Sequence, residues 1–110
     1  MNIYPIDIYT ANGYILFMIK SFADRETEMI FHQRFSKHFP HEIQRVALRK
    51  LIMLNRAKGL DDLRVPPGNR LEALSGNREG QYSIRINDQF RICFKTDGKD
   101  FYLVEVVDYH

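Results

Sequence analysis

The last third of the chain alternates apolar and polar residues with a period of two. Such alternation predicts half-buried β-strands, because successive side chains of a strand point to opposite faces of its sheet. The predicted apolar face consists of Tyr82, Ile84, Ile86, Phe90, Ile92, Phe94, Phe101 and Leu103. The predicted polar face consists of Ser83, Arg85, Arg91, Cys93, Lys95, Tyr102 and Val104. We therefore expect three strands with one face in the core.

The turns between these strands determine their register. Asp97-Gly98 is a strong hairpin signal, because a type I′ turn needs positive φ angles at both central residues. A two-residue loop there places Phe94 opposite Phe101. A three-residue loop over residues 87–89 keeps the apolar positions of the two flanking strands on one face, which a two-residue loop does not.

The same register places two arginines side by side on the polar face. Arg85 lies directly across from Arg91, and like charges in this position destabilise a sheet by tenths of a kcal/mol to about 1 kcal/mol. A pair of guanidinium groups is well suited to bind a phosphate. A straight last strand also brings Asp108 and His110 to this face. The pattern indicates a site for phosphodiester chemistry; the alternative is two solvated arginines on an exposed face.

A strand and two helices are predicted before the sheet. Met18–Phe22 has the pattern of a strand, and Asp24 can cap a helix that runs to about Phe35. A second helix begins near Pro40 and ends before Gly59, the expected residue after its C-cap. Its apolar stripe consists of Ile43, Ala47, Leu51 and Leu54.

The remaining segments complete the element order. Residues 60–69 are expected to be an irregular connector, 70–74 a short strand and 75–80 a polar loop. The order β-α-α-β-β-β-β predicts a compact α+β fold with both helices packed on the apolar face of a mainly antiparallel sheet. Residues 1–17 have no clear period, so the domain is predicted to span 18–110. The first 17 residues are then an N-terminal extension that could add an edge strand.

Composition and charge restrict the function. A length of 110 residues fits one domain, and 45% hydrophobic residues are too many for a disordered chain. The net charge is only +2, but residues 41–95 carry eleven basic and six acidic side chains. This distribution suggests an anionic partner.

Other sequence features point to the cytoplasm and to chemistry without a metal. Cys93 is the single cysteine, which fits a reducing cytosol, and no apolar run is long enough to cross a membrane. The four histidines lack the spacing of a zinc site, and no P-loop or serine-nucleophile motif is present.

Four segments carry a resemblance to a known family. They are MIKSF at 18–22, GNRLEAL at 68–74, GNREGQYSIRINDQFRICF at 76–94 and the terminal VEVVDYH. Together they resemble the HigB-type plasmid-maintenance killer proteins, a branch of the RelE-like type II toxins, over residues 18–110. The resemblance implies an RNase fold and a toxin that enters the ribosomal A site and cuts mRNA. It also implies silencing by a cognate helix-turn-helix antitoxin of the HigA type, and no cofactor.

The resemblance also implies roles for particular residues. The reaction expected is attack of a ribose 2′-OH on the adjacent phosphate, giving a 2′,3′-cyclic phosphate and a 5′-OH. The family's terminal Asp-Tyr-His matches Asp108, Tyr109 and His110, and its sheet arginine matches Arg91. His110 is then the acid or base, since the histidine pKa is near 6.5. Asp108 could act as a base or orient this histidine, and Arg91 is expected to bind the phosphate. Further RNA- or phosphate-binding residues are expected to be Arg78, Arg85, Lys95 and Glu72.

The chain departs from the family in one loop. Related toxins can have a histidine and a lysine where this chain has Glu72 and Ser75. Glu72 could replace the histidine as a base, and loss of the lysine could weaken activity. The competing hypothesis is a non-catalytic basic module that binds RNA or the antitoxin, and a more remote one is a plain structural domain. A binding module should tolerate loss of residues 108–110, whereas the enzyme should not.

Overall fold

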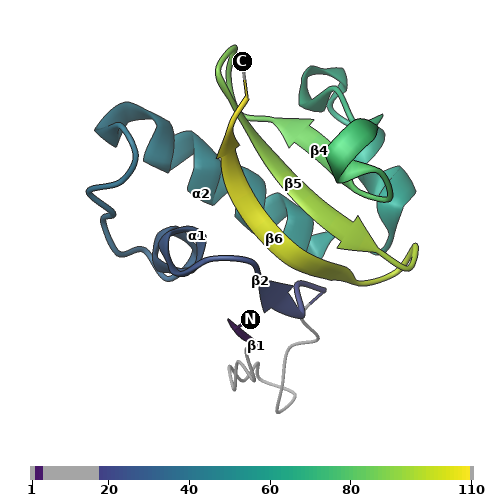
Figure 1. Cartoon of the computed structure of the whole chain (residues 1–110), viewed down its shortest axis with the longest axis horizontal. Helices are drawn as coiled ribbons and strands as arrows, with labels where there is room; N and C mark the ends of the chain where they lie inside the picture. Colours follow the sequence, from purple (N-terminus) through teal and green to yellow (C-terminus); the bar gives the residue numbers. More distant parts are fainter. Residues whose placement is uncertain (1, 4–17, 110) are drawn as a thin grey trace.

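A mixed β-sheet is the frame of the protein in a computed structural model that describes residues 2–3 and 18–109. Within these residues the sheet has six strands in the order β1-β2-β6-β5-β4-β3 (Figure 1). The strands are β1 (Asn2–Ile3), β2 (Ser21–Phe22), β3 (Glu72–Ala73), β4 (Tyr82–Arg85), β5 (Phe90–Thr96) and β6 (Phe101–Asp108). β2 runs parallel to β6, and the other described strand pairs are antiparallel. The predicted α+β fold is confirmed.

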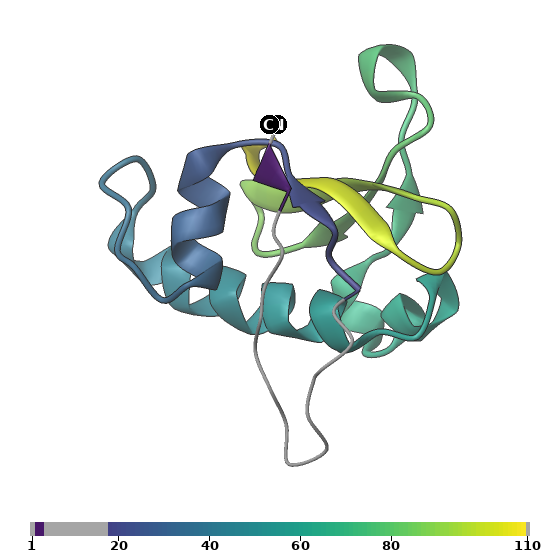
Figure 2. The ribbon, with the colours of Figure 1, turned by 90° about the horizontal axis from the view of Figure 1, so that it is seen from below.

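Two helices cover one side of this sheet (Figure 2). α1 (Arg25–Phe31) begins as predicted at Asp24, whose carboxylate accepts a hydrogen bond of 2.8 Å from the Thr27 backbone N–H. It ends four residues earlier than predicted, because Gln33 has a φ of 61° and turns the chain away. α2 (His41–Arg56) follows Pro40.

The core lies between α2 and the sheet. The predicted stripe of α2 is buried, with Leu51 and Leu54 fully inaccessible to solvent. It faces the apolar side chains of β4, β5 and β6, where Phe94 and Phe101 meet edge to face with ring centroids 5.2 Å apart. Full burial of an aliphatic or aromatic side chain contributes roughly 1.5–3 kcal/mol, so this layer supplies most of the stability.

The register of β4 and β5 agrees with the prediction. Ile84 pairs with Ile92, and Arg85 pairs with Arg91. The Ile86 backbone N–H donates to the Phe90 carbonyl at 2.9 Å, which closes the loop over residues 87–89. The two arginines are therefore cross-strand neighbours, as the apolar alternation requires.

The predicted two-residue turn between β5 and β6 is wrong. Thr96 pairs with Phe101, so the connection has four residues, 97–100. The Asp97 carboxylate accepts hydrogen bonds from the backbone N–H groups of Lys99 (3.0 Å) and Asp100 (2.8 Å). An aspartate that bonds its own following backbone stabilises this wider turn.

A bulge then changes the face on which the rest of β6 presents its side chains. Leu103 has a φ of 51°, and its N–H donates to Ser21 Oγ at 2.9 Å. The register shifts between Cys93 and Lys95, and Val104 rather than Leu103 is buried. The predicted places of Leu103 in the core and Val104 on the polar face were therefore wrong.

The connector between α2 and β3 contains short helical turns. They are the 3₁₀ helices η1 (Leu60–Arg64) and η2 (Pro67–Asn69), followed after β3 by η3 (Gly76–Arg78). Gly59 does not take the predicted left-handed cap conformation, since its φ of 166° is extended. Glycine is needed there for another reason, because a Cβ atom would lie 2.9 Å from the Gly98 carbonyl oxygen.

The N-terminal segment is described only in part. Asn2–Ile3 pairs antiparallel with β2 as an edge strand. The rest of the predicted extension, residues 1 and 4–17, lies outside the described residues, as does His110. The division at residue 18 stays a prediction. No helix among the described residues is long and apolar enough to cross a membrane.

Candidate active site

Arg91 is held rigidly on the side of the sheet away from the helices. It projects from β5, yet its side chain is only 12% exposed. Its Nε donates to Ser83 Oγ at 2.7 Å, and its Nη2 donates to the Arg70 carbonyl at 2.7 Å. Two short bonds from one planar group fix its orientation.

A carboxylate and an aromatic ring flank this guanidinium. Arg91 Nη2 lies 3.8 Å from Glu72 Oε1, and Arg91 Cζ lies 5.9 Å from the centroid of the Tyr109 ring. Tyr109 is 39% exposed, and its backbone N–H donates to the Gln89 carbonyl at 2.6 Å. The backbone of Tyr109 is thus held in place, and its side chain is partly exposed beside Arg91.

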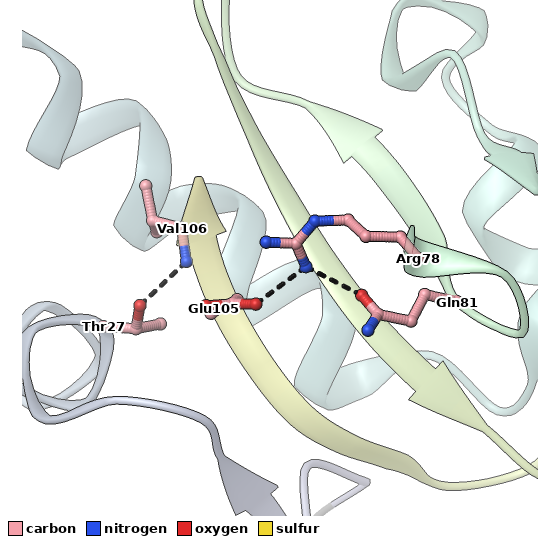
Figure 3. Close-up of polar contacts among 5 residues, drawn as sticks. All are labelled: Thr27, Arg78, Gln81, Glu105 and Val106. Carbon is pink, nitrogen blue, oxygen red and sulfur yellow. Dashed lines mark hydrogen bonds and ion pairs between the residues drawn. The ribbon is translucent and has the colours of Figure 1, made fainter. Parts of the chain in front are cut away.

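A second guanidinium lies over β5 and β6 (Figure 3). Arg78, the last residue of η3, donates from Nη1 to Glu105 Oε1 at 2.8 Å and to Gln81 Oε1 at 2.9 Å. The hydrogen bond to Glu105 is the main cause that raises the pKa of Arg78 above its ordinary value. The guanidinium therefore stays charged.

Two residues of the polar face near Arg91 and Arg78 are buried. Ser83 and Cys93 lie on this face as predicted, but both are fully buried. Burial raises the pKa of the Cys93 thiol, so it stays protonated. Cys93 therefore lies beneath the site residues and does not act as a nucleophile.

Of the other predicted residues, Arg85 is the cross-strand neighbour of Arg91, whereas Asp108 lies on the other face of the sheet. Asp108 pairs with Phe90, so the bulge places it on the helix-bearing face, and the expectation that it shares the face of Arg91 was wrong. It accepts a 3.2 Å hydrogen bond from Gln89 Nε2. Arg85 forms a 2.5 Å ion pair with Asp88. Lys95 is exposed on β5, four residues after Arg91.

Sequence reasoning missed Glu105, Gln81 and Ser83, the residues that hold the arginines. Glu105 shares the face of Arg91 because of the bulge at Leu103, for which the sequence has no clear signal. Among residues 2–3 and 18–109, no group of three histidine, cysteine or acidic side chains could hold a metal ion.

The arrangement provides the parts for binding and cleaving a phosphodiester. Arg91 and Arg78 can bind phosphate oxygens, and both are fixed before any ligand arrives. Glu72, about half exposed beside Arg91, can accept a proton. Tyr109 can stack on a base or donate a hydrogen bond from its hydroxyl.

Comparison with known proteins identifies the family. Residues 20–110 match the model of the HigB-like toxins, described as the RelE-like toxin of the type II toxin-antitoxin system HigB. Toxin HigB-1 of Vibrio cholerae is 42% identical over 84 residues, which cover 74% of this chain and 87% of that protein. Endoribonuclease HigB of Proteus vulgaris is 31% identical over 98 residues, which cover 84% of this chain and all of that protein. The chain belongs to the HigB-like family of RelE-like toxins from type II toxin-antitoxin systems.

Proposed function

We propose that this toxin is an endoribonuclease that cuts mRNA on the ribosome. The observation that carries the proposal is the fixed guanidinium of Arg91, which lies near both the Glu72 carboxylate and the exposed Tyr109 ring. Membership of the family and likeness to a relative named as an endoribonuclease support it. A cognate helix-turn-helix antitoxin is the proposed inhibitor, and mRNA in the ribosomal A site is the proposed substrate.

The proposed reaction is an internal transfer at phosphorus. The ribose 2′-oxygen loses its proton to a base and attacks the adjacent phosphorus, and the 5′-oxygen leaves with a proton from an acid. The products are a 2′,3′-cyclic phosphate and a 5′-OH. Negative charge grows on the phosphoryl oxygens in the transition state, and Arg91 with Arg78 would stabilise it. Neither arginine needs to be reorganised first, because both are already bonded in place.

The acid and the base of the proposed reaction are assigned to two residues. Glu72 is the proposed base, since its carboxylate is exposed and 3.8 Å from Arg91. His110 is the proposed acid on the basis of the family motif and the ordinary pKa of histidine. The Tyr109 ring would stack on the nucleobase of the RNA next to the cleaved bond. Asp108 is proposed to hold the end of β6 through Gln89 and not to touch RNA.

The test is cleavage of a defined message bound to ribosomes, with the full chain purified. Primer extension would map the new 5′ ends, and labelling would show whether they carry a 5′-OH. A message with a single 2′-deoxy nucleotide at the mapped position should resist cleavage, because it lacks the attacking oxygen. A metal-activated water would instead leave a 5′- or 3′-phosphate without a cyclic intermediate and would cut the deoxy message.

Variants connect the activity to the site. Arg91→Ala and Tyr109→Ala should cut slowly, whereas Arg64→Ala, which removes an exposed arginine in η1, should cut normally. Wild-type protein that binds ribosomes but leaves every message intact would establish the non-catalytic binding module in place of the enzyme.

A further inference from the structure

A loop far from β6 in the sequence is fastened to it by one side chain. Residues 75–81 stand on the side of the sheet opposite the helices (Figure 2), and Arg78 reaches from this loop across β5 (Figure 3). Its guanidinium meets Glu105, 27 residues later in the chain, while Gln81 binds the same nitrogen. Arg78 and Glu105 are each less than one-third exposed.

We propose that Glu105 and Gln81 are positioning residues that hold Arg78 in place to receive the scissile phosphate. This inference rests on the proposed nuclease function. Glu105 itself does not contact RNA in this proposal and acts only through Arg78.

The donor pattern of Arg78 fits this role. A guanidinium has five N–H donors, and both described acceptors of Arg78 are bound by Nη1. Nη2 and Nε are left for phosphate oxygens, which they can bind as a pair. The carboxylate therefore orients the cation without occupying the edge of the guanidinium that a phosphate needs.

The backbone that carries Glu105 is held on both sides. Glu105 pairs in register with Cys93, whose side chain is fully buried beneath the face. The backbone N–H of the adjacent Val106 donates to Thr27 Oγ1 at 2.8 Å (Figure 3). The strand is thus anchored to α1 at the position next to Glu105, and the loop that carries Arg78 is anchored to the strand.

The test compares Glu105→Ala, Glu105→Gln and Arg78→Ala with the double variant Arg78→Ala/Glu105→Ala. The rate of cleavage at saturating protein and the affinity for message-bearing ribosomes are measured separately. Glu105→Ala should slow cleavage on the order of 10²-fold, since a displacement of about 1 Å in a positioned group has that effect. Glu105→Gln retains an acceptor for Nη1 and should recover most of the rate. The double variant should be no slower than Arg78→Ala, because Glu105 acts only through Arg78.

Three results would overturn the proposal. Equal losses in Glu105→Gln and Glu105→Ala, with a changed pH profile, would make Glu105 a proton carrier. A further loss in the double variant would show that it acts independently of Arg78. A loss that follows the fraction of unfolded protein would reduce Glu105 to a structural residue.

Hydrogen exchange separates this proposal from the nuclease assignment. The backbone N–H groups of Arg78, Glu79 and Gln81 are bonded within the loop in the wild type. They should exchange faster in Glu105→Ala, and amides of α2 should not. If the wild type cuts no message but this change is seen, Glu105 does hold Arg78 in place and the nuclease function is wrong. If the amides exchange at the wild-type rate, the proposed role of Glu105 in holding Arg78 is wrong.

Discussion

Arg91→Ala should destabilise the protein, although it removes one of two like charges that face each other. The pairing of Arg85 with Arg91 taken alone predicts unchanged or slightly higher stability, with a gain of tenths of a kcal/mol to about 1 kcal/mol. The contacts of Arg91 reverse this expectation. Its guanidinium makes two hydrogen bonds of 2.7 Å, and one of them ends on the fully buried Ser83 hydroxyl.

The expected loss follows from these contacts. A hydrogen bond that involves a charged group contributes about 1.5–3 kcal/mol, and the bond to the exposed Arg70 carbonyl belongs at or below the lower end. The ion pair with Glu72 at 3.8 Å adds at most about 1 kcal/mol, because Glu72 is half exposed. Removing the repulsion between Arg85 and Arg91 offsets only a little of this loss of stability, because Arg85 already pairs with Asp88. The free energy of unfolding should fall by about 2–4 kcal/mol.

Urea unfolding of the wild type, Arg91→Ala and Arg85→Ala measures this difference. Arg85→Ala is the matched control: it relieves the same repulsion but loses only a bond to the fully exposed Asp88. Its free energy of unfolding should stay within about 0.5 kcal/mol of the wild type. An Arg91→Ala protein with an unchanged or higher urea midpoint would refute the reasoning. Cleavage should fall by about 10²–10³ in the folded fraction of Arg91→Ala, because a fixed donor to a developing charge is lost.

Three further predictions concern the two ends of the chain and its thiol. Deletion of residues 108–110 or His110→Ala should lower cleavage by about 10²–10⁴ with the circular dichroism spectrum retained, and normal cleavage by a folded truncation would exclude a role for the tail. Removal of residues 1–17 should leave a cooperative thermal transition and toxicity, and a broad transition would mean that the segment is structural. The raised pKa of Cys93 means that the unfolded chain loses a thiol proton near pH 8.5 that the folded protein keeps, so stability should fall as pH rises through that value. The urea midpoint should fall between pH 7 and pH 9.5, and it should fall less in Cys93→Ala than in the wild type. The lowered pKa of Lys50 acts in the opposite direction, but it does so in both proteins and therefore cancels in this comparison.

The sequence predicted the arginine pair because local patterning leaves little choice. Apolar residues on both sides of the 87–89 loop have to share one face, and only one register allows that. Arg85 and Arg91 then become neighbours whatever the rest of the fold does. The cap at Asp24 and the buried stripe of α2 were predictable for the same reason, since each depends on residues within a few positions.

The last strand was predicted less well because its geometry depends on a distant segment. Leu103 adopts a left-handed conformation that its side chain disfavours, and the Ser21 hydroxyl on β2 binds its N–H. Nothing near Leu103 in the sequence specifies that contact. The error of one residue then moved Asp108 to the wrong face and concealed Glu105 from the prediction.

The place of β6 between β2 and β5 has a consequence for the timing of synthesis. β6 follows every other described strand in the chain, and its partner Ser21 lies 82 positions before Leu103. Such a long-range pairing cannot form on a nascent chain until β6 has left the ribosome, and folding dominated by distant pairings is slow. Glu105 and Tyr109, which hold or flank the two arginines, arrive with the same segment. A growing polypeptide therefore lacks the assembled face until β6 has been made.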